Sequence, residues 1–196
     1  WFLGSETGNA IADILFGDYS PSARLPVSFP QVSGQEPFYY NHRITGRPQL
    51  DPKVPEYKAR YREVTNEALY PFGHGLTYST VDYGPTTVSS TDLAWSGNLT
   101  VSVEISNTGA RDIEEVAQLY IHDRVASLVQ PIRQMKGFRK VALKAGERKR
   151  VEFTLSRNDL AFVQADLKSA AEPGSFDVWI APSATGGTPA RFVLKA

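Results

Sequence analysis

The strongest constraint on this 196-residue chain is a series of short segments, from residue 79 to the end, in which apolar and polar residues alternate. Alternation with a period of two turns one face of a β-strand toward a core and the other toward solvent. Turn signals such as Asn107-Thr108-Gly109 and Glu172-Pro173-Gly174-Ser175 separate the segments at spacings of about 10 residues. The alternating apolar positions include Leu99, Val101, Val103, Ile105, Ala117, Leu119, Ile121, Val151, Phe153, Leu155, Phe176, Val178 and Ile180. We predict a mainly β fold, with an immunoglobulin-like sandwich of about seven strands over residues 79–196.

Residues 1–30 have a different pattern, which begins with an amphipathic helix. Apolar residues recur at helical spacing over residues 10–15 and form one apolar face. Ser5 or Thr7 is expected to cap the helix at its start, and Gly17 is a plausible end. The pattern therefore predicts one short helix whose apolar face needs a covering partner.

A short strand is expected after this helix, because Leu25, Val27 and Phe29 alternate between flanking prolines. One helix and one strand cannot cover their own apolar faces, so we expect them to complete a larger domain. The alternative is that they pack on the sandwich as an N-terminal extension. The chain starts at Trp1 without Met or a signal sequence, and we interpret that start as internal to a longer polypeptide.

Between these parts, residues 31–78 lack periodic structure and are rich in Tyr, Pro, Arg and Asn. A loop of this length is usually either functional or disordered. Its many aromatic residues argue against disorder, because such side chains bury surface. They are Phe38, Tyr39, Tyr40, Tyr57, Tyr61, Tyr70, Phe72 and Tyr78. We therefore predict an ordered connecting loop that lies over neighbouring domains.

The candidate functional residues lie in this loop: Tyr40, Asn41, His42 and Arg47, with Thr45 between them. Aromatic rings stack on the apolar face of a sugar ring, and short polar side chains bind its hydroxyl groups. The combination is therefore typical of a sugar-binding surface. The alternative is a loop that uses these groups for its own internal hydrogen bonds.

The composition argues against several other functions. With 21 basic and 21 acidic residues the net charge is +0, so no overall field attracts nucleic acid or an anionic membrane. The absence of Cys removes disulfides and thiolate metal sites, and the three His residues do not have metal-ligand spacing. We predict no metal site. The acidic residues Asp112, Glu114 and Glu115 are expected to form a solvent-exposed strand edge.

Longer motifs carry a family resemblance. The stretch from Gly4 to Pro26 closely resembles the end of the α/β sandwich domain of family 3 glycoside hydrolases. Tyr39-Tyr40-Asn41-His42 and residues 69–78 resemble connecting segments of the bacterial three-domain β-glucosidases of that family. Residues 116–121 and 134–138 are similar to their C-terminal fibronectin type III-like domain. The resemblance implies three regions, listed by residue number as 1–30 (end of the α/β sandwich domain), 31–78 (connecting loop) and 79–196 (fibronectin type III-like β-sandwich).

The resemblance also implies an activity, namely retaining hydrolysis of terminal β-linked glucose from cello-oligosaccharides or glucosides. Such enzymes use an Asp nucleophile and a Glu acid/base, with the carboxyl groups about 5 Å apart. In the family the Asp belongs to an N-terminal barrel and the Glu to an earlier part of the α/β sandwich domain, and neither motif has a counterpart here. We therefore assign no catalytic residue and no cofactor to this chain, and expect the isolated chain to be inactive.

By the same resemblance, this part is expected to support the N-terminal barrel and α/β sandwich domains of one enzyme. A β-glucoside is its expected substrate, homodimers occur in some members, and the expected location is periplasmic or secreted. Neither nucleic acid nor a membrane is an expected partner. The alternative is a free-standing carbohydrate-binding or adhesion module, against which the uncovered helix argues.

Overall fold

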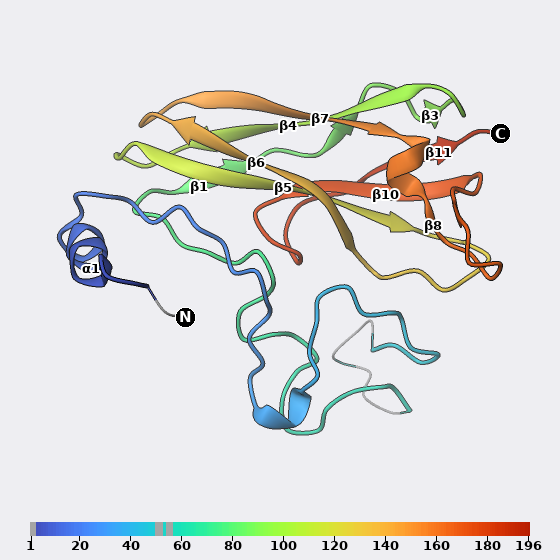
Figure 1. The fold of residues 1–196 in the computed structure, drawn as a ribbon, viewed down its shortest axis with the longest axis horizontal. Coiled ribbons are helices and arrows are strands. Elements are labelled where there is room, and N and C mark those ends of the chain that lie inside the picture. The colour runs from blue at the N-terminus through green and yellow to red at the C-terminus, as the bar shows by residue number, and fades with distance from the viewer. Residues whose placement is uncertain (1–2, 50–52, 54–56) are drawn as a thin grey trace.

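A computed structural model describes residues 3–49, 53 and 57–196. It consists of a two-layered β-sandwich, a long irregular segment beside it and one α-helix at the N-terminal end (Figure 1). The predicted mainly β fold is confirmed. No helix among the described residues is long and apolar enough to cross a membrane.

The first sheet of the sandwich is built on β4, which pairs antiparallel with β1, β2 and β7. In the second sheet the strand order is β3-β11-β10-β5-β6, and only the β11–β3 pair is parallel. The strands of the first sheet are β1 (Val81–Tyr83), β2 (Thr87–Val88), β4 (Asn98–Asn107) and β7 (Arg148–Ser156). Those of the second are β3 (Asp92–Leu93), β5 (Ile113–Asp123), β6 (Gln134–Leu143), β10 (Gly174–Ala181) and β11 (Ala190–Leu194). All the long strands lie where the alternation predicts them.

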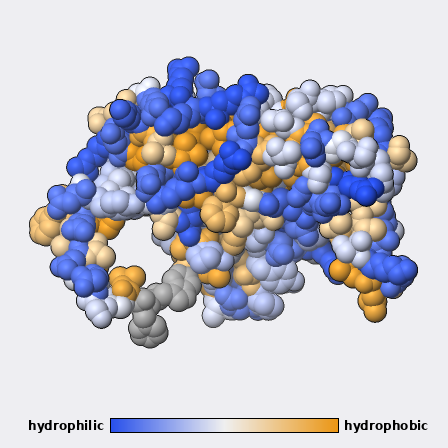
Figure 2. All heavy atoms as spheres, turned by 45° about the horizontal axis from the view of Figure 1, so that its top comes forward, coloured by the Kyte–Doolittle hydropathy of each residue, from blue (hydrophilic) through white to orange (hydrophobic). Residues whose placement is uncertain are grey.

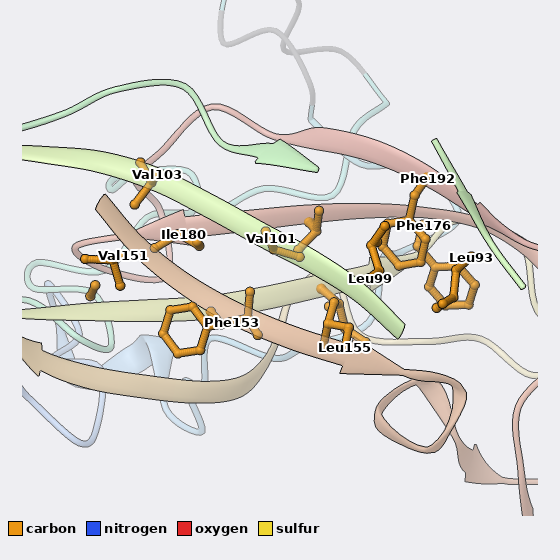
Figure 3. Close-up of a cluster of buried hydrophobic side chains, with 14 of the residues drawn as sticks. Leu93, Leu99, Val101, Val103, Val151, Phe153, Leu155, Phe176, Ile180 and Phe192 are labelled. Carbon is orange, nitrogen blue, oxygen red and sulfur yellow. The ribbon is translucent and has the colours of Figure 1, made fainter. Parts of the chain in front are cut away.

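The core lies between the two sheets and is formed by the predicted inward-facing residues (Figure 3). Leu99, Val101 and Ile105 of β4 are completely buried, as are Phe176 and Ile180 of β10. Burying one such side chain contributes roughly 1.5–3 kcal/mol relative to leaving it exposed. The sandwich therefore completes a hydrophobic core from its own residues.

The predicted helix is α1 (Thr7–Phe16), and it ends as expected at Gly17, which has a left-handed φ of 81°. The predicted cap is wrong, because Glu6 occupies the capping position and no side chain caps the helix. No residue of α1 is buried, and Leu15 and Phe16 are 75% and 84% exposed. On the face seen in Figure 2, apolar residues reach solvent at the end that carries α1 and at the opposite end of the molecule.

The predicted strand at residues 25–29 does not form. Phe29 makes an isolated antiparallel bridge to Tyr70, and Leu25 exchanges backbone hydrogen bonds with Gly73 and His74. A continuous strand needs a neighbouring strand that satisfies its backbone groups, and among the described residues this segment meets only a loop.

Four short elements complete the fold: η1 (Ser33–Gln35), η2 (Arg157–Leu160), β8 (Phe162–Val163) and β9 (Ser169–Ala170). A capping box begins η2, because the Asp159 carboxylate accepts hydrogen bonds from the Ser156 amide and hydroxyl. The helical turn η2 ends at Leu160. Phe162 begins the small β8–β9 hairpin.

Candidate functional site

The irregular segment 31–78 reaches the sandwich through an aromatic cluster on the outer face of the second sheet. Tyr120 of β5 and Trp179 of β10 point away from the main core, yet they are 0% and 8% exposed. Tyr40 and Phe72 cover them. The Tyr40 ring stacks on Phe72 at a centroid distance of 4.2 Å and meets Tyr120 edge-on at 6.0 Å. The cluster is therefore a second, smaller core that joins the loop to the sheet.

Backbone contacts fix the loop next to this cluster. The Met135 amide donates a hydrogen bond to the Tyr40 hydroxyl at 3.2 Å, and the Ile132 amide donates to the His42 carbonyl at 3.0 Å. An isolated bridge joins Arg43 to Pro131. The segment 131–135, which leads into β6, therefore holds the predicted sugar-binding residues against the sandwich.

A buried amide makes a second connection. The Gln118 Nε2 atom donates to the carbonyls of Gly73 at 3.2 Å and Pro182 at 2.6 Å, and the Tyr120 hydroxyl donates to Gln118 Oε1 at 2.6 Å. Gly73 has a φ of +81°, and a Cβ atom there would overlap the Gln118 side chain. The close approach of loop and sheet at this point therefore requires glycine.

The loop is also tied together internally by Gln35, which is only 1% exposed. Its Oε1 atom accepts from the Gln31 amide at 2.6 Å, and its Nε2 atom donates to the Thr65 carbonyl at 3.0 Å. Because a fully bonded buried amide joins residues 31–35 to residues 65–67, the prediction of an ordered loop is confirmed for its described residues.

Two hollows lie on the loop around His42 and Thr45. One, with a volume of about 290 Å³, is also lined by Tyr40 and Asn66. The other, of about 390 Å³, is open to solvent on the side of Tyr39, which is 54% exposed. The first volume lies just below the range of small-molecule sites, about 300–1,000 Å³, and the second lies within it. In both, aromatic rings lie beside imidazole, hydroxyl and amide groups, a combination that suits a sugar; the rings are half-buried in the first hollow and partly exposed in the second.

The predicted site residues do not all gather there. His42 lines both hollows and Tyr40 lines the first, whereas Asn41 and Arg47 are exposed and line neither. One face of the Tyr40 ring is covered by Phe72, so that face is closed to a sugar. Arg47 contributes to the structure of the loop through its backbone, because its carbonyl accepts a hydrogen bond from the Ala59 amide at 2.7 Å. Sugar contact by these four residues stays a prediction.

A larger, apolar groove of about 790 Å³ lies between α1 and the segments around residues 21–29 and 70–76. Ile14 of the helix lines it, with Leu25, Phe29 and Leu76. Three of the apolar residues around it are substantially exposed: Leu76 at 73%, Tyr70 at 45% and Phe29 at 39%. The groove continues the uncovered face of α1, and together they form an apolar surface of the kind that marks an interface.

A buried ion pair links this N-terminal region to the sandwich. The Arg24 guanidinium binds the Glu115 carboxylate of β5, and their side chains are 8% and 2% exposed. The Tyr83 hydroxyl donates to the same carboxylate at 2.8 Å, and burial together with Glu115 raises the Tyr83 pKa far above its ordinary value. Our expectation of an exposed acidic edge is therefore wrong for Glu115, which needed the distant Arg24 as its partner.

Arg24 Nε is buried and has no hydrogen-bond partner among the described residues. Within the same part of the chain, no group of three or more His, Cys, Asp or Glu residues could hold a metal ion.

Two family models match separate parts of this chain. The model for the glycosyl hydrolase family 3 C-terminal domain matches residues 1–78, and the model for the fibronectin type III-like domain matches residues 115–184. The chain corresponds to the C-terminal portion of a family 3 glycoside hydrolase. The first match covers the uncovered helix and the loop, and the second lies within the self-contained sandwich.

Relatives in this family match almost the whole chain. A periplasmic β-glucosidase of Salmonella typhimurium is 49% identical over 180 residues, which cover 92% of this chain and 24% of that protein. A β-xylosidase of Formosa agariphila is 38% identical over 93% of this chain and 24% of its own length. The structure of a Listeria innocua β-glucosidase in complex with glucose superposes with a TM-score of 0.93 at 37% identity, over 100% of this chain and 27% of that one. The chain thus spans about a quarter of the length of these relatives.

Proposed function

We propose that this chain is the C-terminal part of a retaining β-glucosidase, which hydrolyses terminal β-linked glucose from cello-oligosaccharides or other glucosides. The observation that carries the proposal is the agreement in fold, along the entire chain, with a β-glucosidase solved in complex with glucose. The nucleophilic Asp and the acid/base Glu would lie in the upstream domains. We also propose export to the periplasm, as the name of the Salmonella relative suggests.

In this proposal the chain supports the catalytic domains rather than performing chemistry. The uncovered face of α1 and the adjoining apolar groove would pack against the rest of the α/β sandwich domain. Residues 1–30 would complete that domain, and the fibronectin type III-like sandwich would hold them in place through Arg24 and Glu115. The proposal is supported by the contrast between a closed core in the sandwich and exposed apolar residues in α1.

The loop is proposed to border the sugar site, with Tyr40, Asn41, His42 and Arg47 as the residues nearest the substrate. The two hollows beside His42 support this, because they combine aromatic rings with polar groups. Homodimer formation remains a further proposal, made by analogy with the family.

The test is a comparison of the complete enzyme with the isolated chain. We expect the complete enzyme to hydrolyse an aryl β-glucoside with a kcat/KM about tenfold or more above that for the matching β-xyloside. We expect the isolated chain to turn over neither. Preference for the xyloside would contradict the proposed β-glucosidase activity and would indicate a β-xylosidase, like the Formosa relative. Turnover by the isolated chain would refute the supporting role.

Calorimetry of the isolated chain with cellobiose tests the alternative of a free-standing carbohydrate-binding module. A module of that kind would bind the sugar without its upstream domains, and a supporting domain would not. No binding is the expected result, because the hollows of the loop would form only one side of the sugar site.

A further inference from the structure

Arg133 occupies an unusual position for a charged side chain in a β-sandwich. It is half-buried, and its guanidinium lies over the Trp179 ring at 4.3 Å and over the Tyr120 ring at 5.8 Å. Its Nη1 atom donates to the Gly186 carbonyl at 2.8 Å. In the described part of the chain it has no carboxylate partner. The charge is therefore used to hold two aromatic rings and one backbone carbonyl together.

The segment that carries Arg133 is the one that contacts the loop. The residue before it, Ile132, donates its amide proton to the His42 carbonyl, and Met135 donates to the Tyr40 hydroxyl. Tyr120, under the guanidinium, also packs against the Tyr40 ring. Movement of Arg133 would therefore be transmitted to both predicted sugar-binding residues that line the hollows.

We propose that Arg133 is a positioning residue of the sugar site: anchored on Trp179 and Gly186, it holds segment 131–135 so that His42 keeps its place beside the substrate. The inference rests on the proposed function, because it needs a sugar site that the loop borders. Arg133 itself does not line either hollow. It acts through the backbone of its neighbours, and the sandwich thereby contributes to substrate binding.

The chemistry requires arginine at this position. A planar guanidinium can lie flat on the indole ring and still donate a hydrogen bond in its own plane, whereas a lysine ammonium has no such plane. Arg133→Lys should therefore keep the positive charge over the ring but lose part of the geometry. Arg133→Met fills a similar volume and loses both interactions.

The experiment measures kcat and KM for cellobiose in the complete enzyme. We expect Arg133→Met to raise KM about fivefold or more with kcat changed less than about twofold, because a misplaced binding group weakens substrate and transition state alike. Arg133→Lys should fall between Arg133→Met and the unchanged enzyme. Amide hydrogen exchange should quicken at Ile132 and Met135 in both variants, since their acceptors lie on the loop.

The matched control is Arg139→Met, which removes a different cation–π contact, made by a residue of β6. Arg139 lies over Phe153 at 5.4 Å, is exposed and does not touch the loop. Equal kinetics in the two Met variants would refute the proposal, as would a fall in kcat with KM unchanged. Arg133→Lys decides the question if the Met variant does not fold. An unchanged enzyme that fails to hydrolyse glucosides would instead contradict the proposed function.

Discussion

In residues 79–196 most of the large apolar side chains meet one another between two sheets, whereas in residues 3–30 many of them reach solvent. Phe176 of β10 is 0% exposed, and Phe16 of α1 is 84% exposed. Both are phenylalanines in regular secondary structure, so the difference comes from what surrounds each element. The sandwich supplies partners for its own strands, while no residue of α1 is buried. The first region therefore contains its own core, and the second leaves apolar residues that the described part of the chain does not cover.

The loop between these regions is an intermediate case. It is held by a small aromatic cluster and by buried polar groups rather than by a core of its own. Buried polar contacts of this kind need specific partners in specific positions, because a missing partner leaves a desolvated group unpaired. Polar contacts therefore fix the position of the loop on the sandwich, and apolar burial fixes the sandwich itself.

The largest expected effect tests the contrast between the two phenylalanines. In the isolated chain, Phe176→Ala should lower the free energy of unfolding by about 3–5 kcal/mol, because it leaves a cavity in the core. Phe16→Ala should change it by less than about 0.5 kcal/mol, because the ring contacts little. Chemical denaturation of each variant measures both values.

The same two variants, measured in the complete enzyme as well, test whether another domain covers α1. If the rest of the α/β sandwich domain covers α1, Phe16→Ala should become destabilising in the complete enzyme. An effect of Phe16→Ala that is equally small in both proteins would contradict the proposed docking of α1.

The next effect concerns the ion pair that joins the two regions. Glu115→Gln should destabilise the chain by about 3 kcal/mol, because it leaves the buried Arg24 cation without a compensating charge. The control Glu104→Gln removes an exposed pair with Arg148, at 3.7 Å, and should cost less than about 1 kcal/mol. The double variant Arg24→Met with Glu115→Leu should recover most of the loss. A loss in the double variant as large as in Glu115→Gln would mean that the charge itself is not the cause.

The sequence predicted the sandwich well because its signal is local. The long strands β4, β7 and β10 repeat an apolar residue at every second position. The strand predicted at residues 25–29 does not form, because a strand needs a neighbouring strand and alternation in the sequence does not reveal one. Glu115 was misjudged in the same way. Its partner Arg24 lies 91 positions away in the sequence, and no local pattern connects the two.

For the candidate site, the sequence located the loop but not what holds it. Gln118, Arg133 and Trp179 were not among the predicted site residues, because they belong to the sandwich. A signal was nevertheless present: Tyr120 and Trp179 are large rings on the strand face that alternation assigns to solvent. Large rings on an apparently polar face indicate a second covered surface. The Arg133 contacts required the folded chain, because they join three separate segments.

The smallest effect tests how closely the loop must approach the sheet. Gly73→Ala should destabilise the chain by about 1–3 kcal/mol, because the residue needs a positive φ and its new methyl group would overlap Gln118. Gly46→Ala is the matched control in the same loop, since it has open space and no positive φ. The melting temperatures of the two variants measure the difference. If Gly73→Ala melts like Gly46→Ala, the loop can move away from Gln118 without loss. The polar contacts would then not fix the position of the loop. The loop and the sandwich would differ only in how much apolar surface each of them buries.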